Sequence, residues 1–237
     1  MHTLSTPPAT TTSNPTNPTN PSVTPRTRTR RWPLIGLLAA GTGMGAAILS
    51  ISTVADEADV ATGVDVLDQL DRGRYHAAFL LGLVSVVALH LVASGWRRWA
   101  DQRAPGSIAA RTIGTGLTAT ATVNTIFTCL AGSMALYLPG GTDAGWLSRE
   151  GMFVNYSLLD FGPLLGWWGA MVSAACVAWV ALRERLLARW LGVASIVLVL
   201  LPLIPVAATG LPGIVGLAMP IWLALVSIGV GASRRAG

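Results

Sequence analysis

Two histidines, His76 and His90, have the spacing of residues that could ligate haem. They are fourteen positions apart, so on one helix their rings point to nearly the same side, about 21 Å apart along the axis. Helices of the cytochrome b type hold two stacked haems in this way, with opposing ligands from another helix. The third histidine is His2, near the start of the chain. No second helix therefore supplies opposing histidines, so we predict that no cofactor is bound. A haem redox protein stays an alternative.

A set of polar residues at one expected depth is the second candidate for chemistry. Counting about 1.5 Å per residue along the apolar runs places five polar side chains roughly 20 Å from the outer surface: Thr42, His90, Asn124, Ser173 and Ser195. His90 and Asn124 are costly to expose to hydrocarbon, so we expect both to face a bundle interior. This polar layer either binds a small ligand or ion, or only joins helices through hydrogen bonds. Four threonines also share one side of a helix: Thr115, Thr118, Thr122 and Thr125.

Catalytic motifs are missing from the sequence. Ala131-Gly132-Ser133-Met134 lacks the second glycine of an intramembrane serine protease, and there is neither a His/Glu metal pair nor a phosphate-binding loop. Cys129 and Cys176 are expected about 14 and 24 Å from the outer surface, too far apart in depth for a disulfide. These absences favour a protein that is not an enzyme without deciding the question, and we predict no metal site.

Glycines and prolines recur inside the apolar runs. Gly41-Thr42-Gly43-Met44-Gly45 resembles a dinucleotide-binding loop, but no strand precedes it, and the four-residue spacing of Gly41 and Gly45 favours close helix packing. Gly162 and Gly166 have the same spacing. Pro202, Pro205 and Pro220 are predicted to interrupt the last two spans. Broken helices mark sites in transporters, although no charged residue accompanies these prolines within the apolar runs.

Composition indicates the elements that must position these residues. Hydrophobic residues make up 52% of the chain and charged residues only 11%, against about 25% charged in soluble domains. The apolar residues form runs long enough to cross a bilayer, which predicts an all-α, polytopic transmembrane helix bundle over residues 32–235. The expected spans cover residues 33–55, 75–96, 109–138, 161–182, 191–208 and 212–232.

The connecting segments differ in composition. Residues 1–31 are rich in Thr, Pro and Asn and end in arginines, so they are predicted to be a disordered cytoplasmic tail. Residues 56–74 carry six carboxylates, which favour a solvated acidic surface, with a short amphipathic helix, over a calcium loop. A glycine-rich loop from Pro139, containing Trp146 and Tyr156, is expected at the membrane interface.

The distribution of arginines predicts the orientation. All sixteen basic residues are arginine. With both termini in the cytoplasm, thirteen arginines lie inside, whereas Arg72, Arg74 and Arg149 lie outside, as the positive-inside rule requires. The expected location is the bacterial inner (plasma) membrane, and the partner is the lipid bilayer rather than nucleic acid.

The sequence resembles an uncharacterised group of six-span bacterial membrane proteins. The similarity lies in Arg189-Trp190-Leu191-Gly192, in the apolar run that follows and in Pro220-Ile221-Trp222, and it extends over residues 32–235. The resemblance implies a six-span fold and no known activity. We therefore predict binding or passage of a small, weakly polar ligand through the polar layer. An accessory or scaffold subunit of a membrane complex, with another membrane protein or a second copy as partner, is an alternative.

Overall fold

The computed structural model describes residues 32–51, 63–210 and 213–232. Within those residues the regular secondary structure is all helical, without a strand, and six helical segments are long and apolar enough to cross a membrane. This confirms the predicted all-α, six-span class. The predictions for residues 1–31, and for the part of the acidic segment before residue 63, lie outside the described residues.

The first three spans are single helices. Helix α1 runs over Trp32–Ser50, α2 over Arg72–Arg103 and α3 over Ile108–Tyr137. At 32 residues, α2 is about 48 Å long, well beyond the roughly 30 Å of hydrocarbon, so it extends past the predicted 75–96 at both ends. Helix α1 ends at Ser50 rather than at residue 55. The Arg74 guanidinium donates to the carbonyls of Ile48 and Ile51 and so caps this end.

The fourth span is broken into two helices. Helix α4 covers Arg149–Leu165 and α5 covers Trp168–Leu182. The predicted span began at residue 161, so residues 149–160, including Tyr156, were wrongly assigned to a loop. Ser148 caps the start of α4 by accepting from the Gly151 amide, with Glu150 in the first turn, both favourable at a helix N-terminus.

The last two spans are α6, Arg189–Thr209, and α7, Ile214–Ala232. Pro202 and Pro205 lie inside α6 and Pro220 inside α7. The predicted interruption of these spans is therefore wrong, because both helices continue through their prolines. Gly210, with φ of 73°, ends α6 in the left-handed conformation that glycine favours.

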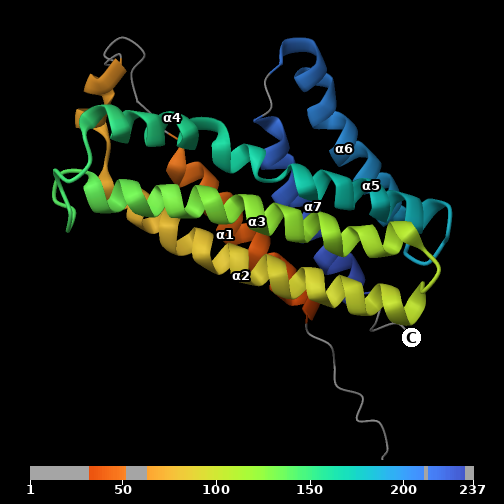
Figure 1. Cartoon of the computed structure of the whole chain (residues 1–237). Coiled ribbons are helices and arrows are strands. Elements are labelled where there is room, and N and C mark those ends of the chain that lie inside the picture. Colours follow the sequence, from red (N-terminus) through yellow and green to blue (C-terminus); the bar gives the residue numbers. More distant parts are fainter. Residues whose placement is uncertain (1–31, 52–62, 211–212, 233–237) are drawn as a thin grey trace, which may run out of the picture.

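The helices pack side by side as a bundle, and one end of α6 leans away from the other helices (Figure 1). Helix α2 lies between α1 and α3, α5 contacts α3 and α6, and α7 contacts α6 and α1. Helices α4 and α5 both contact α3 and α7, but α4 also contacts α1, whereas α5 contacts α6. Three tryptophans are fully buried in the core: Trp96 of α2, Trp222 of α7 and Trp167 in the turn between α4 and α5.

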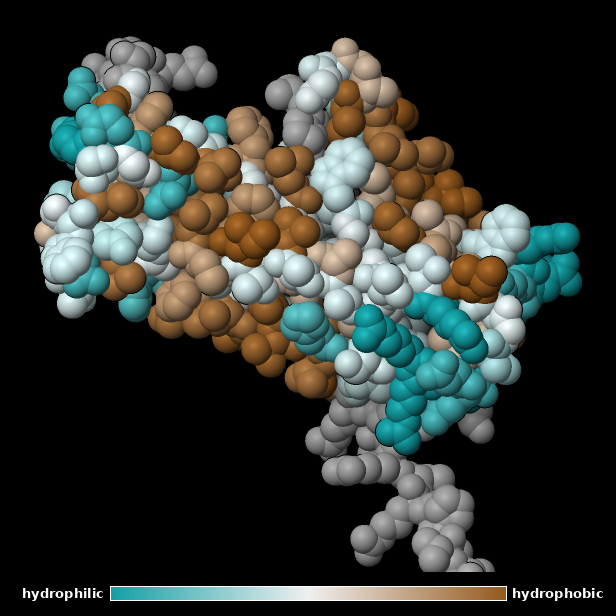
Figure 2. Space-filling view, in the orientation of Figure 1, coloured by the Kyte–Doolittle hydropathy of each residue, from teal (hydrophilic) through white to brown (hydrophobic). Residues whose placement is uncertain are grey.

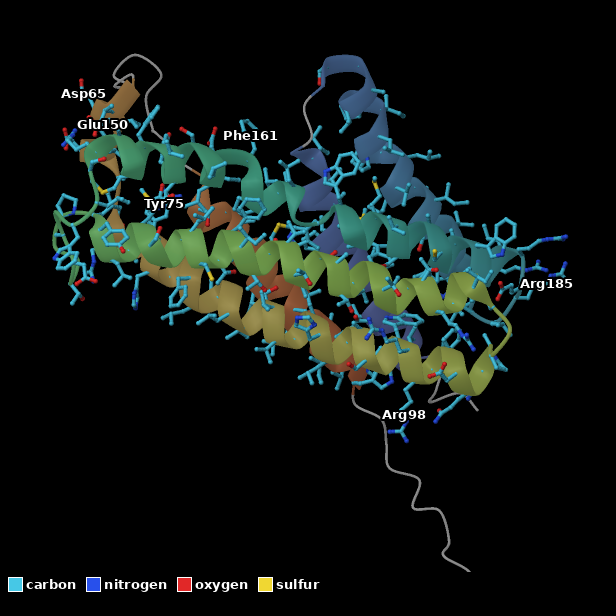
Figure 3. All side chains as sticks on the ribbon, in the orientation of Figure 1. Asp65, Tyr75, Arg98, Glu150, Phe161 and Arg185 are labelled. Carbon is cyan, nitrogen blue, oxygen red and sulfur yellow. The ribbon has the colours of Figure 1, made fainter. Side chains whose placement is uncertain are left out.

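The two ends of the bundle carry opposite charges. Figure 3 shows Arg98 and Arg185 at one end and Asp65 and Glu150 at the other. At the arginine end, the Ser107 hydroxyl donates to a carboxylate oxygen of Glu184 at 2.7 Å, which joins the α2–α3 turn to the α5–α6 turn. Figure 2 shows an apolar surface between the two polar ends, as expected for a protein that crosses a bilayer.

Candidate intramembrane binding site

A small cavity lies among α1, α2, α3 and α4. Its volume is about 20 Å³, which is room for roughly one water molecule. Four polar side chains line it, one from α1, one from α2 and two from α3: Ser50, Ser85, Asn124 and Thr128. No charged side chain is among the described residues that line it. The cavity is therefore a polar but uncharged site inside the membrane-spanning bundle.

The two serines that line the cavity have their protons engaged. The Ser85 hydroxyl donates to the Ala39 carbonyl of α1 at 3.0 Å, and Ser50 donates to the Ala46 carbonyl of its own helix at 2.8 Å. Each hydroxyl oxygen keeps lone pairs that can accept a further bond. The serines therefore offer acceptors to the cavity.

Asn124 and Thr128 are buried without partners. Their exposed fractions are 9% and 6%, and within the part of the chain that the structure describes neither side chain makes a hydrogen bond. Since buried polar groups are almost always hydrogen-bonded, an amide and a hydroxyl that face a cavity indicate a site for a small hydrogen-bonding molecule.

Glycines on the neighbouring helices make room for these side chains. A Cβ added to Gly82 would lie 2.5 Å from the Thr128 hydroxyl, and one added to Gly43 would lie 2.7 Å from the Ser85 hydroxyl. The predicted packing role of Gly41 is wrong, because nothing lies within 4 Å of its Cβ position. Gly43, two residues later, makes the close contact.

The break in the fourth span lies beside the cavity. Pro163, which lines it, has no N–H to donate within α4. The Gly166 amide still bonds to the Gly162 carbonyl at 3.0 Å, whereas the Trp167 amide turns to Leu164 at 3.4 Å. Gly166 packs against the Asn124 side-chain amide, where a Cβ would collide with it. The spacing of Gly162 and Gly166 predicted close packing, and Gly166 does make such a contact, whereas Pro163 was not singled out in the sequence.

The predicted polar layer is not one layer. Ser173 contacts Gly116 of α3, whereas Asn124 of the same helix contacts Gly166. Eight residues of α3 separate these contacts, about 12 Å. The depth count was wrong for the fourth span because α4 begins at Arg149 rather than near residue 161.

Ser173, Ser195 and Thr42 each have a hydrogen-bond partner within the bundle. The Ser173 hydroxyl donates to the Ile113 carbonyl of α3 at 2.8 Å, and the Ser195 hydroxyl accepts from the Trp222 indole N–H at 2.9 Å. The Thr42 hydroxyl donates to Leu38 of its own helix at 2.7 Å. Of the five predicted residues, Asn124 is the one that the structure brings to the cavity.

His90 lies on the outer surface of α2, and so does His76. The expectation that His90 faces the interior is therefore wrong, because the interior positions of this turn are taken by Ala88 and Leu89. Within the described residues, no group of three or more His, Cys, Asp or Glu side chains could hold a metal ion. The haem alternative stays a prediction.

Asp160 was missed by the sequence reasoning because it stands one residue before the predicted start of the fourth span. In the structure it is half-buried inside α4, three residues before Pro163. Acidic residues within membrane spans are rare and mark functional regions. Asp160 has apolar neighbours on both sides in the sequence, Leu158-Leu159 before it and Phe161 after it. This pattern indicates a position inside a span.

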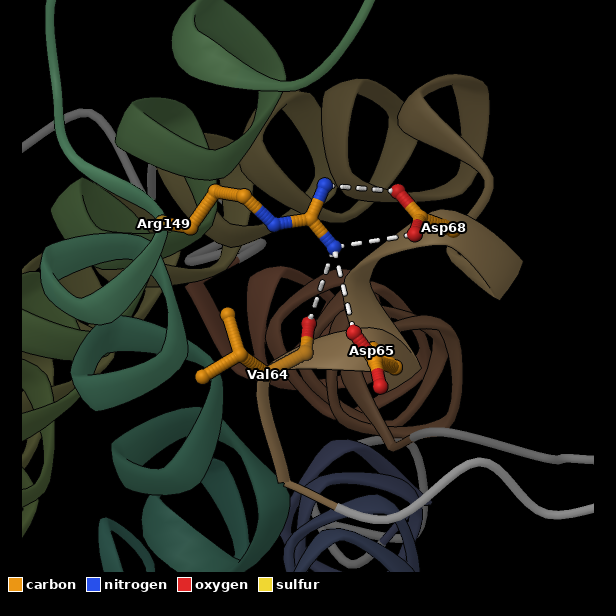
Figure 4. A network of polar contacts seen from close by, with 4 residues as sticks. All are labelled: Val64, Asp65, Asp68 and Arg149. Atoms are coloured by element: carbon orange, nitrogen blue, oxygen red, sulfur yellow. Dashed lines mark hydrogen bonds and ion pairs between the residues drawn. The ribbon is translucent and has the colours of Figure 1, made fainter.

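The described part of the acidic segment is held by Arg149 at the end of the bundle where α4 begins. A short 3₁₀ helix, η2, covers Gly63–Gln69, where the sequence predicted an amphipathic helix, and buries Val66 and Leu67. Arg149 bonds both carboxylate oxygens of Asp68 at 2.9 Å and lies 3.8 Å from Asp65 (Figure 4). The hydrogen bond from Arg149 lowers the pKa of Asp68 below its ordinary value. These carboxylates pair with an arginine on α4.

Comparison of this chain with protein-family models, curated proteins and solved structures finds no match to any of them. The resemblance to six-span bacterial membrane proteins is not tested by these comparisons and stays a prediction.

Proposed function

We propose that this multi-pass membrane protein binds a small, uncharged, hydrogen-bonding molecule in the cavity among α1–α4. One observation carries the proposal: Asn124 and Thr128, both more than nine-tenths buried, face the cavity without partners. The amide supplies donors and an acceptor, and the hydroxyls supply further acceptors. A ligand that carries both a donor and an acceptor can form hydrogen bonds with the amide and with the hydroxyls.

The lining of the cavity favours a neutral ligand. A charged ligand in a low-dielectric site needs a counter-charge or a metal, and the described lining offers only an amide and hydroxyl groups. These groups orient a ligand but are poor general acids or bases. This supports a binding or transport role rather than an enzymatic one.

The break in the fourth span gives the site a means to open. Discontinuous helices form the binding sites of many transporters, because the two halves can move separately. Here Pro163 and Gly166 lie at the cavity, so displacement of α4 relative to α5 would enlarge it. The cavity as it stands is the closed form of the proposed site.

Single cysteines test whether the site opens to water. In a variant without Cys129 and Cys176, Ser85→Cys and Thr128→Cys should react with a small water-soluble thiol reagent. Ser173→Cys is the matched control, because Ser173 is fully buried and bonded to Ile113. Reaction from both sides of the membrane would indicate passage, and reaction from one side would indicate binding. Equal labelling at all three positions, or none at the two cavity positions, would contradict the proposal.

We further propose that both termini lie in the cytoplasm and that the membrane is the bacterial plasma membrane. The separation of arginines from carboxylates along the bundle supports this orientation (Figure 3). Reporter fusions at Gly106 and at the C-terminus should report cytoplasm, and one at Gly141 the outside. A C-terminal reporter on the outside would rule the orientation out.

A further inference from the structure

One face of the α2–α3 pair is polar although it points away from the bundle. Its members, here called the polar face, are exposed or half-buried: His90, Ser94, Thr115, Thr118, Thr122 and Thr125. In Figure 2 the brown surface gives way to white and teal over α3 and the adjoining part of α2. Exposed apolar residues border the polar face on α2 and α3, such as Val87, Leu91 and Ile126. On α6 the exposed residues include Leu200, Leu201 and Ile204, which suits contact with lipid.

The polar face lies within the membrane span. Arg97 marks its arginine-rich end, where its guanidinium donates to the Thr118 hydroxyl at 2.9 Å. His90 precedes Arg97 by seven residues, which is about 10 Å of helix. Because α2 and α3 are antiparallel, with Gly82 against Thr128 and Gly114 against Arg97, His90 lies near the level of Thr118 and Thr122. A histidine at this depth is costly against hydrocarbon.

The polar face presents more hydrogen-bond acceptors than donors. The hydroxyls of Ser94, Thr118, Thr122 and Thr125 donate to carbonyls of their own helices at 2.8–3.0 Å, so they present mainly oxygen acceptors. The His90 side chain has no hydrogen-bond partner among the described residues, and its neutral ring carries one N–H donor and one nitrogen acceptor. Thr118 already accepts from Arg97, so the face fits a partner that brings a donor to its other hydroxyls and an acceptor to its histidine.

We propose that the polar face is the contact between two copies of this chain, related by a two-fold axis. In a two-fold contact the same patch lies on both sides, so each His90 meets the hydroxyl oxygens around Thr118 and Thr122 of the other copy. Small side chains let the helices approach closely. The contact removes both histidines from lipid and pairs their donors with acceptors that each face already holds.

Oxidative cross-linking in native membranes tests this contact. In the variant without Cys129 and Cys176, cysteines at Thr118, Thr122 and Thr125 are compared with Leu200→Cys, an exposed control on α6. We expect a band of twice the chain mass at one or more of the threonine positions and none at position 200. No dimer band at any of the three, equal bands at position 200, or a band with a different protein would each overturn the proposal.

Substitution of His90 tests the hydrogen bonds separately from the contact. His90→Leu removes the donor and leaves an apolar group that lipid tolerates, so cross-linking should fall roughly tenfold as two bonds are lost. His90→Gln keeps a donor and an acceptor and should retain most of the cross-linking. Because His90 is on the surface, both variants should insert and fold. Equal cross-linking by the leucine and glutamine variants would overturn the role of His90.

Discussion

Two pairs of buried polar residues, one pair on each side of the bundle, differ in their hydrogen bonds. Toward α5, α6 and α7, Ser173 bonds to the α3 backbone and Ser195 bonds to the Trp222 indole. Among α1–α4, Asn124 and Thr128 are also buried but face a cavity. The residue types are similar, so polarity and depth do not separate a structural hydrogen bond from a candidate site. The two cases differ in whether the side chain has a hydrogen-bond partner on the neighbouring helix.

The largest expected difference concerns glycines on the two sides. A Cβ at Gly169 would lie 2.5 Å from the Gly116 carbonyl oxygen and 2.8 Å from the Thr120 amide nitrogen. These are backbone atoms that cannot move aside, so Gly169→Ala should lower the free energy of unfolding by about 3 kcal/mol. A Cβ at Gly82 meets the Thr128 side chain, which can rotate into the cavity, so Gly82→Ala should lower it by about 1 kcal/mol.

Reversible unfolding in mixed detergent micelles would measure both variants. Gly41→Ala is the matched control, because its Cβ position is open and alanine favours helix over glycine. It should be neutral or slightly stabilising. If Gly82→Ala were as destabilising as Gly169→Ala, the cavity would not accommodate the displaced threonine, and the contrast between the two sides would fail.

The sequence predicted the class of fold well because the bilayer constrains it strongly. Apolar runs of span length placed α1, α3, α6 and α7 within a few residues, except for the end of α1. The start of α4 was missed because residues 149–157 include Arg149, Glu150, Asn155 and Ser157, so hydropathy there is low. A hydropathy count does not detect the part of a helix that extends beyond the hydrocarbon.

The site was predicted only in part, since depth was counted but helix rotation was not. Asn124 was identified from its polarity, and it does line a cavity. His90 was expected inside for the same reason, yet the rotation of α2 is set by Ala88, Leu89 and Val92, which occupy its buried side. Thr128 was not singled out because threonine is common in α3. Its distinction is its contact with Gly82, which depends on how α2 packs.

A smaller difference is expected when the polar groups themselves are removed. Ser195→Ala leaves the buried Trp222 N–H without its acceptor, and the free energy of unfolding should fall by about 1 kcal/mol. Asn124→Leu removes no hydrogen bond to a described residue and should change it by less than about 0.5 kcal/mol. The same unfolding assay measures both. A larger loss for Asn124→Leu than for Ser195→Ala would show that the asparagine has a structural partner.

The smallest effect is expected at the exposed acidic end of the bundle, where Arg149 holds η2 through Asp68 (Figure 4). Because Arg149 lowers the pKa of Asp68, the folded state favours the charged carboxylate. The stabilisation is therefore complete above the ordinary pKa of aspartate and is lost as the pH falls through the lowered folded value. Both side chains are largely exposed, so salt should weaken the pair.

Titration of Asp68 by carbon NMR in lipid nanodiscs should show its pKa rising toward the ordinary value in Arg149→Gln. Asp65, at 3.8 Å from the same guanidinium, provides the control, since Asp65→Asn should leave the Asp68 titration nearly unchanged. An Asp68 titration that is the same with and without Arg149 would mean that the ion pair does not persist in solution and that η2 is held by Val66 and Leu67 alone.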